Sequence, residues 1–327
     1  MAVFHNKDLA GKSFLITGGA GFIGSHITEY LLTHGAGKVR VLDNLATGSE
    51  KNVAMFAANN RYEFIHGDIR DFETCQKACA GIDHVSHQAA LGSVPRSVKD
   101  PVTSNEVNVS GHLNMLTAAK DAAVKTFIYA SSSAVYGDEP NLPKREEKIG
   151  NLLSPYAVTK KTNELYADVF GRLYGMKIAG LRYFNVFGPR QDPEGPYAAV
   201  IPLFVSGIIN KTPVYINGDG EQTRDFTYVE NAVQANIRAM LSDNEDAFGL
   251  AYNVAVGEKF SVNFLFDSIC SLLRMQHTPV YREPREGDIR NSLADISRAK
   301  GLLGYEPTER FKDGLKITVE YFKKMYS

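Results

Sequence analysis

The chain has 327 residues, of which 44% are hydrophobic and 22% are charged, and its formal net charge is −1. This length accommodates one large α/β domain with a smaller second lobe, and the apolar content is sufficient for a core. A nearly neutral chain offers no electrostatic attraction to nucleic acid or to an anionic membrane surface. We therefore expect a small molecule as the partner, with no nucleic acid and no membrane.

Cysteine usage and the start of the chain bear on location. Cys75, Cys79 and Cys270 are an odd number without zinc-ligand pairs, so we assign no metal site and expect thiols in a reducing compartment. Residues 1–12 contain no apolar core of a signal peptide, and nowhere do eighteen apolar residues run together. These features favour a cytoplasmic protein.

The first 188 residues alternate between two patterns. Short apolar runs predict strands at 13–17, 39–42, 62–65, 83–87, 126–130 and 177–183. Helical periodicity predicts helices at 24–32, 72–80, 107–119 and 155–173. Strands that alternate with helices of this length indicate a doubly wound parallel sheet of the Rossmann type, which we assign to residues 1–188.

The alternation ends after Gly188, where a stretch rich in Pro, Gly and Asp marks a loop. Beyond it, strands are predicted at 214–217, 252–256 and 280–282. We expect residues 189–327 to form a smaller, mixed α/β lobe that covers the substrate. A segment around 222–250 is expected to return to the first domain.

A glycine loop follows the first predicted strand, with Gly18, Gly21 and Gly24 in a three-residue spacing. Such glycines let backbone N–H groups approach a pyrophosphate at a helix N-terminus, although a glycine cluster alone could be a mere turn. Asp43 ends the second strand, where its carboxylate can bind the ribose hydroxyls of adenosine and repel a 2′-phosphate. NAD is therefore favoured over NADP. Asp68, after the third strand, is placed at the adenine edge or is a turn residue.

Tyr156 precedes Lys160 by four residues in the predicted helix 155–173, and no other Tyr-x-x-x-Lys occurs in the chain. This spacing puts both side chains on one helical face, where an ammonium favours the phenolate and lowers the pKa of tyrosine from about 10. The tyrosine can then act as a general base. Serines 131–133 follow the strand 126–130 and should emerge at the ligand edge of the sheet, unless they form only a polar turn.

Together, these residues resemble the extended short-chain dehydrogenase/reductase family, in its nucleotide-sugar epimerase and dehydratase branch. The resemblance covers essentially the whole chain, including residues 87–90, 181–185 and 285–288. Segments 89–96 and 197–202 are most similar to bacterial UDP-N-acetylglucosamine 4-epimerases.

The resemblance implies roles for individual residues. Tyr156 would take the proton of sugar O4, Lys160 would lower its pKa, and Ser132 would orient O4. The residues implied to bind NAD are Gly18, Gly21, Phe22, Ile23, Gly24, Asp43, Asn44, Gly48, Asp68, Ile69, Gln88, Ala89, Ala90, Asn108, Ser131, Tyr156, Lys160 and Tyr183. Those implied to bind a UDP-sugar are Ser93, Ser132, Ser133, Asn185, Ala199, Val200, Tyr215, Asn217, Arg224, Arg285, Asp288 and Ser292.

The implied reaction passes hydride from C4 to NAD and back to the opposite face of a transient 4-keto sugar. Dehydratases of this branch carry Asp-Glu directly after the catalytic Thr, whereas Ser133 and Ala134 stand here, which disfavours dehydration. Ser292 matches a position where a bulky aromatic tends to exclude 2-acetamido sugars. The expected activity is therefore 4-epimerisation of UDP-N-acetylglucosamine and UDP-N-acetylgalactosamine.

Two other readings stay open, namely a UDP-glucose/galactose or UDP-glucuronate 4-epimerase and a non-catalytic, NAD-binding regulatory protein. Helices 107–119 and 155–173 resemble those that pair in this family across a homodimer interface as a four-helix bundle.

Overall fold

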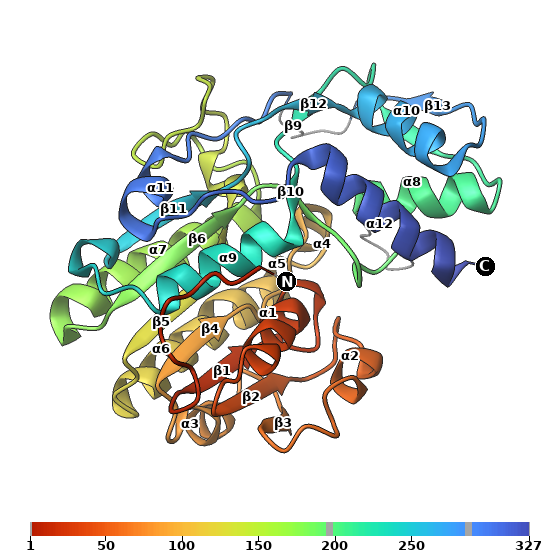
Figure 1. The fold of residues 1–327 in the computed structure, drawn as a ribbon. Coiled ribbons are helices and arrows are strands. Elements are labelled where there is room, and N and C mark those ends of the chain that lie inside the picture. Colours follow the sequence, from red (N-terminus) through yellow and green to blue (C-terminus); the bar gives the residue numbers. More distant parts are fainter. Residues whose placement is uncertain (1, 194–198, 285–289, 327) are drawn as a thin grey trace.

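The computed structural model describes residues 2–193, 199–284 and 290–326 (Figure 1). Its centre is a seven-stranded parallel sheet with the order β11-β6-β5-β4-β1-β2-β3, which confirms the predicted doubly wound fold. The strands are β1 (Ser13–Thr17), β2 (Lys38–Asp43), β3 (Tyr62–His66), β4 (His84–His87), β5 (Thr126–Ser132), β6 (Ile178–Tyr183) and β11 (Leu250–Val254). In this order, β2 and β3 lie on one side of β1, and the remaining strands lie on the other. The strand order therefore reverses between β1 and β4, and such a reversal opens a ligand crevice at the carboxyl ends of the strands.

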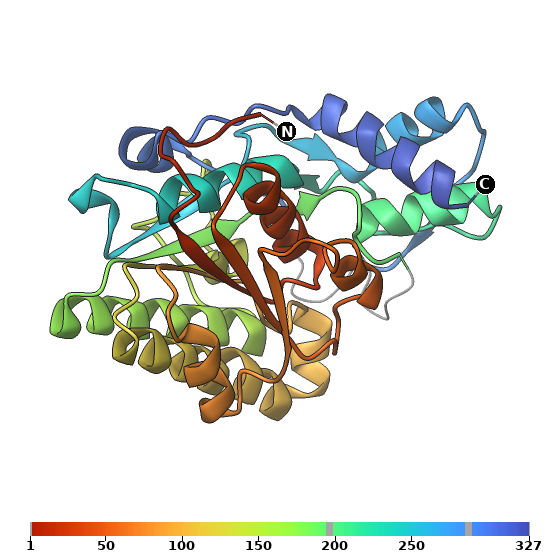
Figure 2. The same cartoon turned by 60° about the horizontal axis from the view of Figure 1, so that its bottom comes forward.

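Helices cover both faces of the large sheet (Figure 2). Successive side chains of β1 enter different cores, since Phe14 and Ile16 pack in one apolar cluster and Leu15 packs in another. The first cluster includes residues of α1 (Phe22–Thr33), α9 (Val229–Met240) and α11 (Ser297–Leu303). The second includes residues of α3 (Phe72–Cys79), α6 (Gly111–Asp121) and α7 (Pro155–Tyr174). Burial on both faces explains why these strands read as continuous apolar runs.

The edge strand β11 differs from its prediction. The sequence placed a strand at 252–256 and assigned it to the smaller lobe, whereas Leu250–Val254 pairs in parallel with β6, from Ala179 to Tyr183. An apolar run predicts a strand but does not say which distant strand it will join, so the sheet assignment was wrong.

One predicted helix is built from different turns. Residues 107–119 begin as a π-helical turn, η1 (Glu106–Ser110), and continue as α6. Several short elements were not predicted, because they offer too few residues for a period to show. These are α2 (Glu50–Ala54), α4 (Val94–Lys99), α5 (Pro101–Asn105), η2 (Ser133–Tyr136), η3 (Glu245–Ala247), β7 (Val186–Phe187) and β10 (Thr227–Tyr228).

A second group of elements packs beside the large sheet, at the upper right of Figure 1. It contains α8 (Val200–Ile209), α10 (Val262–Leu273) and α12 (Phe311–Met325) around a core of its own. Two ribbons complete it, β8 (Tyr215–Asn217) with β13 (Val280–Arg282) and β9 (Thr223–Arg224) with β12 (Phe260–Ser261). In the parts of the chain that the structure describes, no helix has the length and apolarity needed to cross a membrane.

Candidate active site

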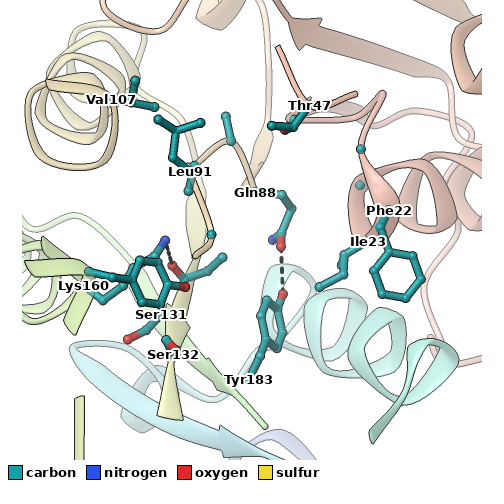
Figure 3. A pocket seen from close by; sticks show the side chains of 18 of the residues that line it. Phe22, Ile23, Thr47, Gln88, Leu91, Val107, Ser131, Ser132, Lys160 and Tyr183 are labelled. Carbon is teal, nitrogen blue, oxygen red and sulfur yellow. Dashed lines mark hydrogen bonds between the residues drawn. The ribbon is translucent and has the colours of Figure 1, made fainter. Parts of the chain in front are cut away.

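A cavity of about 770 Å³ opens where the central strands end. In Figure 3, Phe22 and Ile23 lie on one side of this cavity, and Ser131, Ser132 and Lys160 lie on the other. Gln88 and Tyr183 stand between the two groups. The crevice expected from the reversed strand order is therefore present, with the glycine loop at one side and the predicted catalytic residues at the opposite side.

The glycine loop has the geometry of a phosphate cradle. Gly18 has φ +67°, and a Cβ atom there would lie 2.7 Å from the backbone nitrogen of Ala89. A Cβ on Gly24 would collide with the carbonyl oxygen of Gly18. The N-cap of α1 is Gly21, which has no side chain to bind the free N–H groups of the first helical turn. Those N–H groups and the helix dipole suit the pyrophosphate of a dinucleotide.

The end of β2 carries Asp43, the residue predicted to bind the ribose hydroxyls. The buried carboxylate of Asp43 is held by the backbone N–H groups of Ala20, at 3.0 Å, and Leu45, at 2.8 Å. Burial raises the pKa of Asp43. Arg40 points away from the crevice, because its guanidinium donates to Glu63 at 2.9 Å and to the carbonyl of Ala78 at 2.7 Å. No cation from β2 is thus directed to a 2′-phosphate, and the residues fit NAD.

The predicted adenine edge carries a small polar cluster. Asn44 donates to the carboxylate of Asp68 at 2.8 Å, and Arg70 forms an ion pair with the same carboxylate at 2.8 Å. The hydrogen bond from Arg70 is the main reason why the pKa of Asp68 falls to about 2. Asp68 therefore stays ionised and fixed in the cavity wall.

The predicted catalytic pair lies at the start of α7. Ser154 caps this helix by accepting a hydrogen bond from the backbone N–H of Ala157 at 3.2 Å, and Pro155 occupies the first turn. The ammonium of Lys160 donates to the carbonyl of Ala130 at 2.8 Å and lies 5.9 Å from the centroid of the Tyr156 ring. The helix therefore brings both side chains to the end of β5, as the spacing predicted.

The pKa of Tyr156 differs from the expectation. Burial raises the pKa of its phenol, and a hydrogen bond with the side chain of Ser132 opposes this rise. Burial also lowers the pKa of Lys160 to about 8. Without bound cofactor or substrate, burial therefore changes the pKa of both groups more than the phenolate–ammonium attraction does, although the spacing had suggested that this attraction would dominate.

Tyr183 belongs to a buried hydrogen-bond network. Its hydroxyl donates to the Oε1 atom of Gln88 at 3.0 Å and accepts from the Nδ2 atom of Asn236 at 2.7 Å. Gln88 also donates to Asn236 at 3.0 Å and to Ser86 at 2.9 Å. Asn236 lies on α9, in the second half of the chain, and the sequence analysis missed it because no local motif surrounds it.

Ser131 is turned toward the protein interior. Its hydroxyl donates to Glu164 at 2.8 Å, and Arg182 binds both oxygens of that carboxylate, at 2.8 and 2.9 Å. Although burial raises the pKa of Glu164, the hydrogen bonds and charge of Arg182 hold it below its usual value. Glu164 follows Lys160 by one further helical turn, and this repeat of the spacing was the signal that could have identified it.

The structure brings most of the predicted residues together in this cavity. Its wall contains Gly18, Gly21, Phe22, Ile23, Gly24, Asp43, Asn44, Asp68, Ile69, Gln88, Ala89, Ala90, Ser131, Ser132, Ser133, Tyr156, Lys160, Tyr183, Asn185, Arg224 and Ser292.

Three predicted residues support the wall without forming it. The amide of Asn108 is buried and binds the backbone N–H of Leu91 at 2.7 Å. Ser93 caps α4 by accepting from the N–H of Arg96 at 3.2 Å. Gly48 leaves room for Ala20 and for the carboxylate of Asp43, since a Cβ at Gly48 would come within 3.0 Å of both side chains.

A second cavity, of about 590 Å³, continues from the first into the smaller lobe. Asn185 and Arg224 line both cavities, so they stand where the two meet. The predicted residues Ala199, Val200, Tyr215 and Asn217 line the second cavity. Arg285 and Asp288 lie outside the described residues.

Known proteins resemble this chain over nearly its whole length. Residues 14–255 match the NAD dependent epimerase/dehydratase family. A UDP-N-acetylglucosamine 4-epimerase from Methanobrevibacter ruminantium, solved with UDP-N-acetylmuramic acid, is 41% identical with a TM-score of 0.89, over 96% of this chain and 99% of that one. A UDP-glucose 4-epimerase from Thermus thermophilus, solved with NAD, is 36% identical with a TM-score of 0.84, over 95% of this chain and 98% of that one. The UDP-glucose 4-epimerase of Mycolicibacterium smegmatis is 36% identical over 94% of this chain and 98% of its own.

Proposed function

Because the chain belongs to the NAD-dependent epimerase/dehydratase family and is similar throughout to UDP-sugar 4-epimerases, we propose that it interconverts UDP-N-acetylglucosamine and UDP-N-acetylgalactosamine. The two joined cavities support this proposal. The first combines the dinucleotide cradle with Ser132, Tyr156 and Lys160, and the second leads away from them past Asn185 and Arg224. A UDP-sugar has the matching shape, with a sugar at one end of a diphosphate and a nucleoside at the other.

The catalytic residues would work as one proton-transfer unit. Tyr156 would accept the proton of sugar O4 and later return it. The hydroxyl of Ser132, which is hydrogen-bonded to the phenol of Tyr156, would orient O4. Lys160 would supply positive charge beside the phenol from its place on the carbonyl of Ala130. When bound, NAD supplies the hydride acceptor and donor for C4. The guanidinium of Arg224, at the junction of the cavities, suits the diphosphate.

The choice of an N-acetylated sugar depends on one wall residue. Ser292 lines the catalytic cavity, and its backbone N–H is fixed by the carbonyl of Thr223 at 3.1 Å. A serine at this fixed point leaves room that a large aromatic side chain would fill. The same room also admits a sugar without the acetamido group, which keeps UDP-glucose and UDP-galactose as the second candidate pair.

A panel of UDP-sugars tests this assignment. The wild-type protein and Ser292→Tyr are incubated with UDP-N-acetylglucosamine, UDP-glucose and UDP-glucuronate, and the epimers are separated by chromatography. We expect Ser292→Tyr to lose at least about tenfold in kcat/KM for the acetylated sugar, because a filled pocket rejects the larger substrate, and to lose less than about threefold for UDP-glucose. Ser292→Ala is the matched control and should retain both activities. Equal loss on both sugars, or turnover of UDP-glucuronate alone, would contradict the assignment.

We also propose that the protein is a homodimer in which α6 and α7 of two copies form a four-helix bundle. A row of apolar side chains on α7 supports this, because Val158, Leu165, Val169 and Leu173 are 39 to 69% exposed. Their spacing places them on one side of the helix. Val98 and Val102, on the neighbouring α4 and α5, extend the same apolar surface.

A further inference from the structure

Asn236 lies on α9, behind the wall of the first cavity. Its side chain is fully buried and lines neither cavity. The Nδ2 atom donates to the hydroxyl of Tyr183 at 2.7 Å and to the carbonyl of Ala232 at 2.8 Å. The Oδ1 atom accepts from the side chains of Gln88 and Ser86, each at 3.0 Å. The amide therefore uses both of its donors and both of its acceptor sites inside the protein.

These bonds fix the orientation of two residues that do line the first cavity, Tyr183 and Gln88. The hydroxyl of Tyr183 donates its proton to the Oε1 atom of Gln88 (Figure 3), so its oxygen is left to accept from Asn236. Turning either side chain would leave a buried donor or acceptor without a partner, which costs free energy. Burial also raises the pKa of the Tyr183 phenol, although the hydrogen bonds with Asn236 and Gln88 oppose this rise. Tyr183 and Gln88 thus form a fixed, uncharged part of the cavity wall.

The order of the site along the cavity indicates which half of NAD meets this part of the wall. The glycine loop and Asp43 fit the pyrophosphate and the adenosine ribose. Because hydride is exchanged beside Tyr156 in the proposed reaction, the nicotinamide half extends from the glycine loop toward Tyr156. Gln88 and Tyr183 stand between these two groups (Figure 3). Their fixed side chains therefore face the path of the nicotinamide half.

We infer that Asn236 is a positioning residue for the cofactor, which holds Tyr183 and Gln88 in place against the nicotinamide half of NAD. The inference rests on the proposed function for the direction in which NAD lies, and it does not depend on which UDP-sugar is the substrate. It makes cofactor binding depend on a helix from the second half of the chain.

ADP-ribose separates this role from a purely structural one. It contains the adenosine, both phosphates and the second ribose of NAD, but it has no nicotinamide. A loss of positioning at Tyr183 and Gln88 should weaken the binding of NAD and leave the binding of ADP-ribose nearly unchanged. A general loosening of the fold would weaken both ligands alike.

Equilibrium dialysis of the full chain against labelled NAD and against labelled ADP-ribose tests the inference. Asn236→Ala should bind NAD about tenfold more weakly and ADP-ribose with less than about a threefold change. Asn231→Ala is the matched control, because Asn231 is also a fully buried amide on α9. Its side chain bonds to the backbone of Thr308 at 2.9 Å and of Glu309 at 2.7 Å, away from both cavities. This control should keep both affinities within about threefold of the wild type.

A second variant removes the same hydrogen bond from the cavity side. Tyr183→Phe keeps the aromatic ring, so it decides the question even if Asn236→Ala does not fold, and it too should weaken NAD more than ADP-ribose. The double variant should lose less NAD affinity than the product of the two single losses, because both substitutions remove one shared bond.

Equal weakening of NAD and ADP-ribose, unchanged binding of both, or a double loss equal to the product of the single losses would overturn the inference. Because no sugar takes part, these measurements are separate from the panel of UDP-sugars. If the wild-type protein binds NAD but turns over no UDP-sugar, the proposed function fails, while the two ligands still decide the role of Asn236.

Discussion

Burial sets the protonation of the two residues that start α7. Lys160 is 3% exposed and Tyr156 lines the cavity, and burial lowers the pKa of the first and raises the pKa of the second. The free protein therefore favours a protonated phenol, and the charge that stabilises a phenolate has to come from Lys160 in its ammonium form. Measuring activity as a function of pH can therefore test whether the charge of Lys160 is needed.

The pH dependence of activity follows from the lowered pKa of Lys160. Below a pH of about 8 the side chain is an ammonium, and above it the side chain becomes neutral and stops stabilising the phenolate. We expect kcat/KM for UDP-N-acetylglucosamine to fall as the pH rises through about 8, by up to about tenfold per pH unit. Circular dichroism at each pH provides the control for unfolding. A rate that continues to rise between pH 8 and 9.5 would show that the charge of Lys160 is not needed.

The elements of the fold were predictable where their signal is local. The strands buried on both faces read as apolar runs, and the glycine loop and the Tyr156/Lys160 spacing lie within single segments. The site residues Asn236 and Glu164 were missed because their role arises from packing, one from α9 onto Tyr183 and one beneath Ser131. The sheet position of β11 depends on pairing with a strand far away in the chain. The pattern of residues within one segment does not predict contacts with residues far away in the sequence.

The buried carboxylate of Asp225 connects three chain segments near the cavities: its own, the loop after β11, and the segment around Ala294. Asp225 lies between β9 and β10 and accepts hydrogen bonds from the backbone N–H groups of Val256, Gly257 and Ala294, at 3.0, 3.1 and 3.2 Å. It follows Arg224 directly, so it fixes the segment that carries this arginine against the loop after β11. The placement of Arg224 therefore depends on a residue that lines neither cavity.

Removing this carboxylate tests how much the connection contributes. In Asp225→Ala, three buried N–H groups lose their acceptor, and we expect the free energy of unfolding in urea to fall by about 3 kcal/mol, about 1 kcal/mol for each bond. Asp219→Ala is the control, because Asp219 forms an exposed ion pair with Arg290 and should change stability by less than about 1 kcal/mol. If Asp225→Ala unfolds within about 1 kcal/mol of the wild type, the three bonds do not hold the segment.

At the scale of the whole molecule, the cavities and the apolar surface of α7 lie in different places. The first cavity opens at the carboxyl ends of the strands and the second continues into the smaller lobe, whereas Leu165 and its neighbours face outward from the helical layer. A second copy can therefore cover the apolar row without closing the cavity from that side. Association and substrate binding should then respond to different substitutions.

Light scattering on the purified protein tests the proposed dimer. We expect twice the mass of the chain at micromolar concentration, and we expect Leu165→Glu to reduce it to a monomer by placing a charge in the apolar interface. Ile317→Glu is the matched control, because Ile317 is also exposed but lies on α12, and this variant should remain a dimer. A wild-type monomer at this concentration would reject the bundle.

The most direct test of the central claim is turnover of UDP-N-acetylglucosamine by the wild-type protein and by Tyr156→Phe, without added reductant. The account predicts that the wild type forms UDP-N-acetylgalactosamine until the two epimers reach equilibrium. Tyr156→Phe should lose at least about a hundredfold in kcat, because the O4 proton then has no base, while UDP binding stays unchanged. A Tyr156→Phe variant within about tenfold of the wild type, or a wild-type protein that forms no epimer, would contradict it.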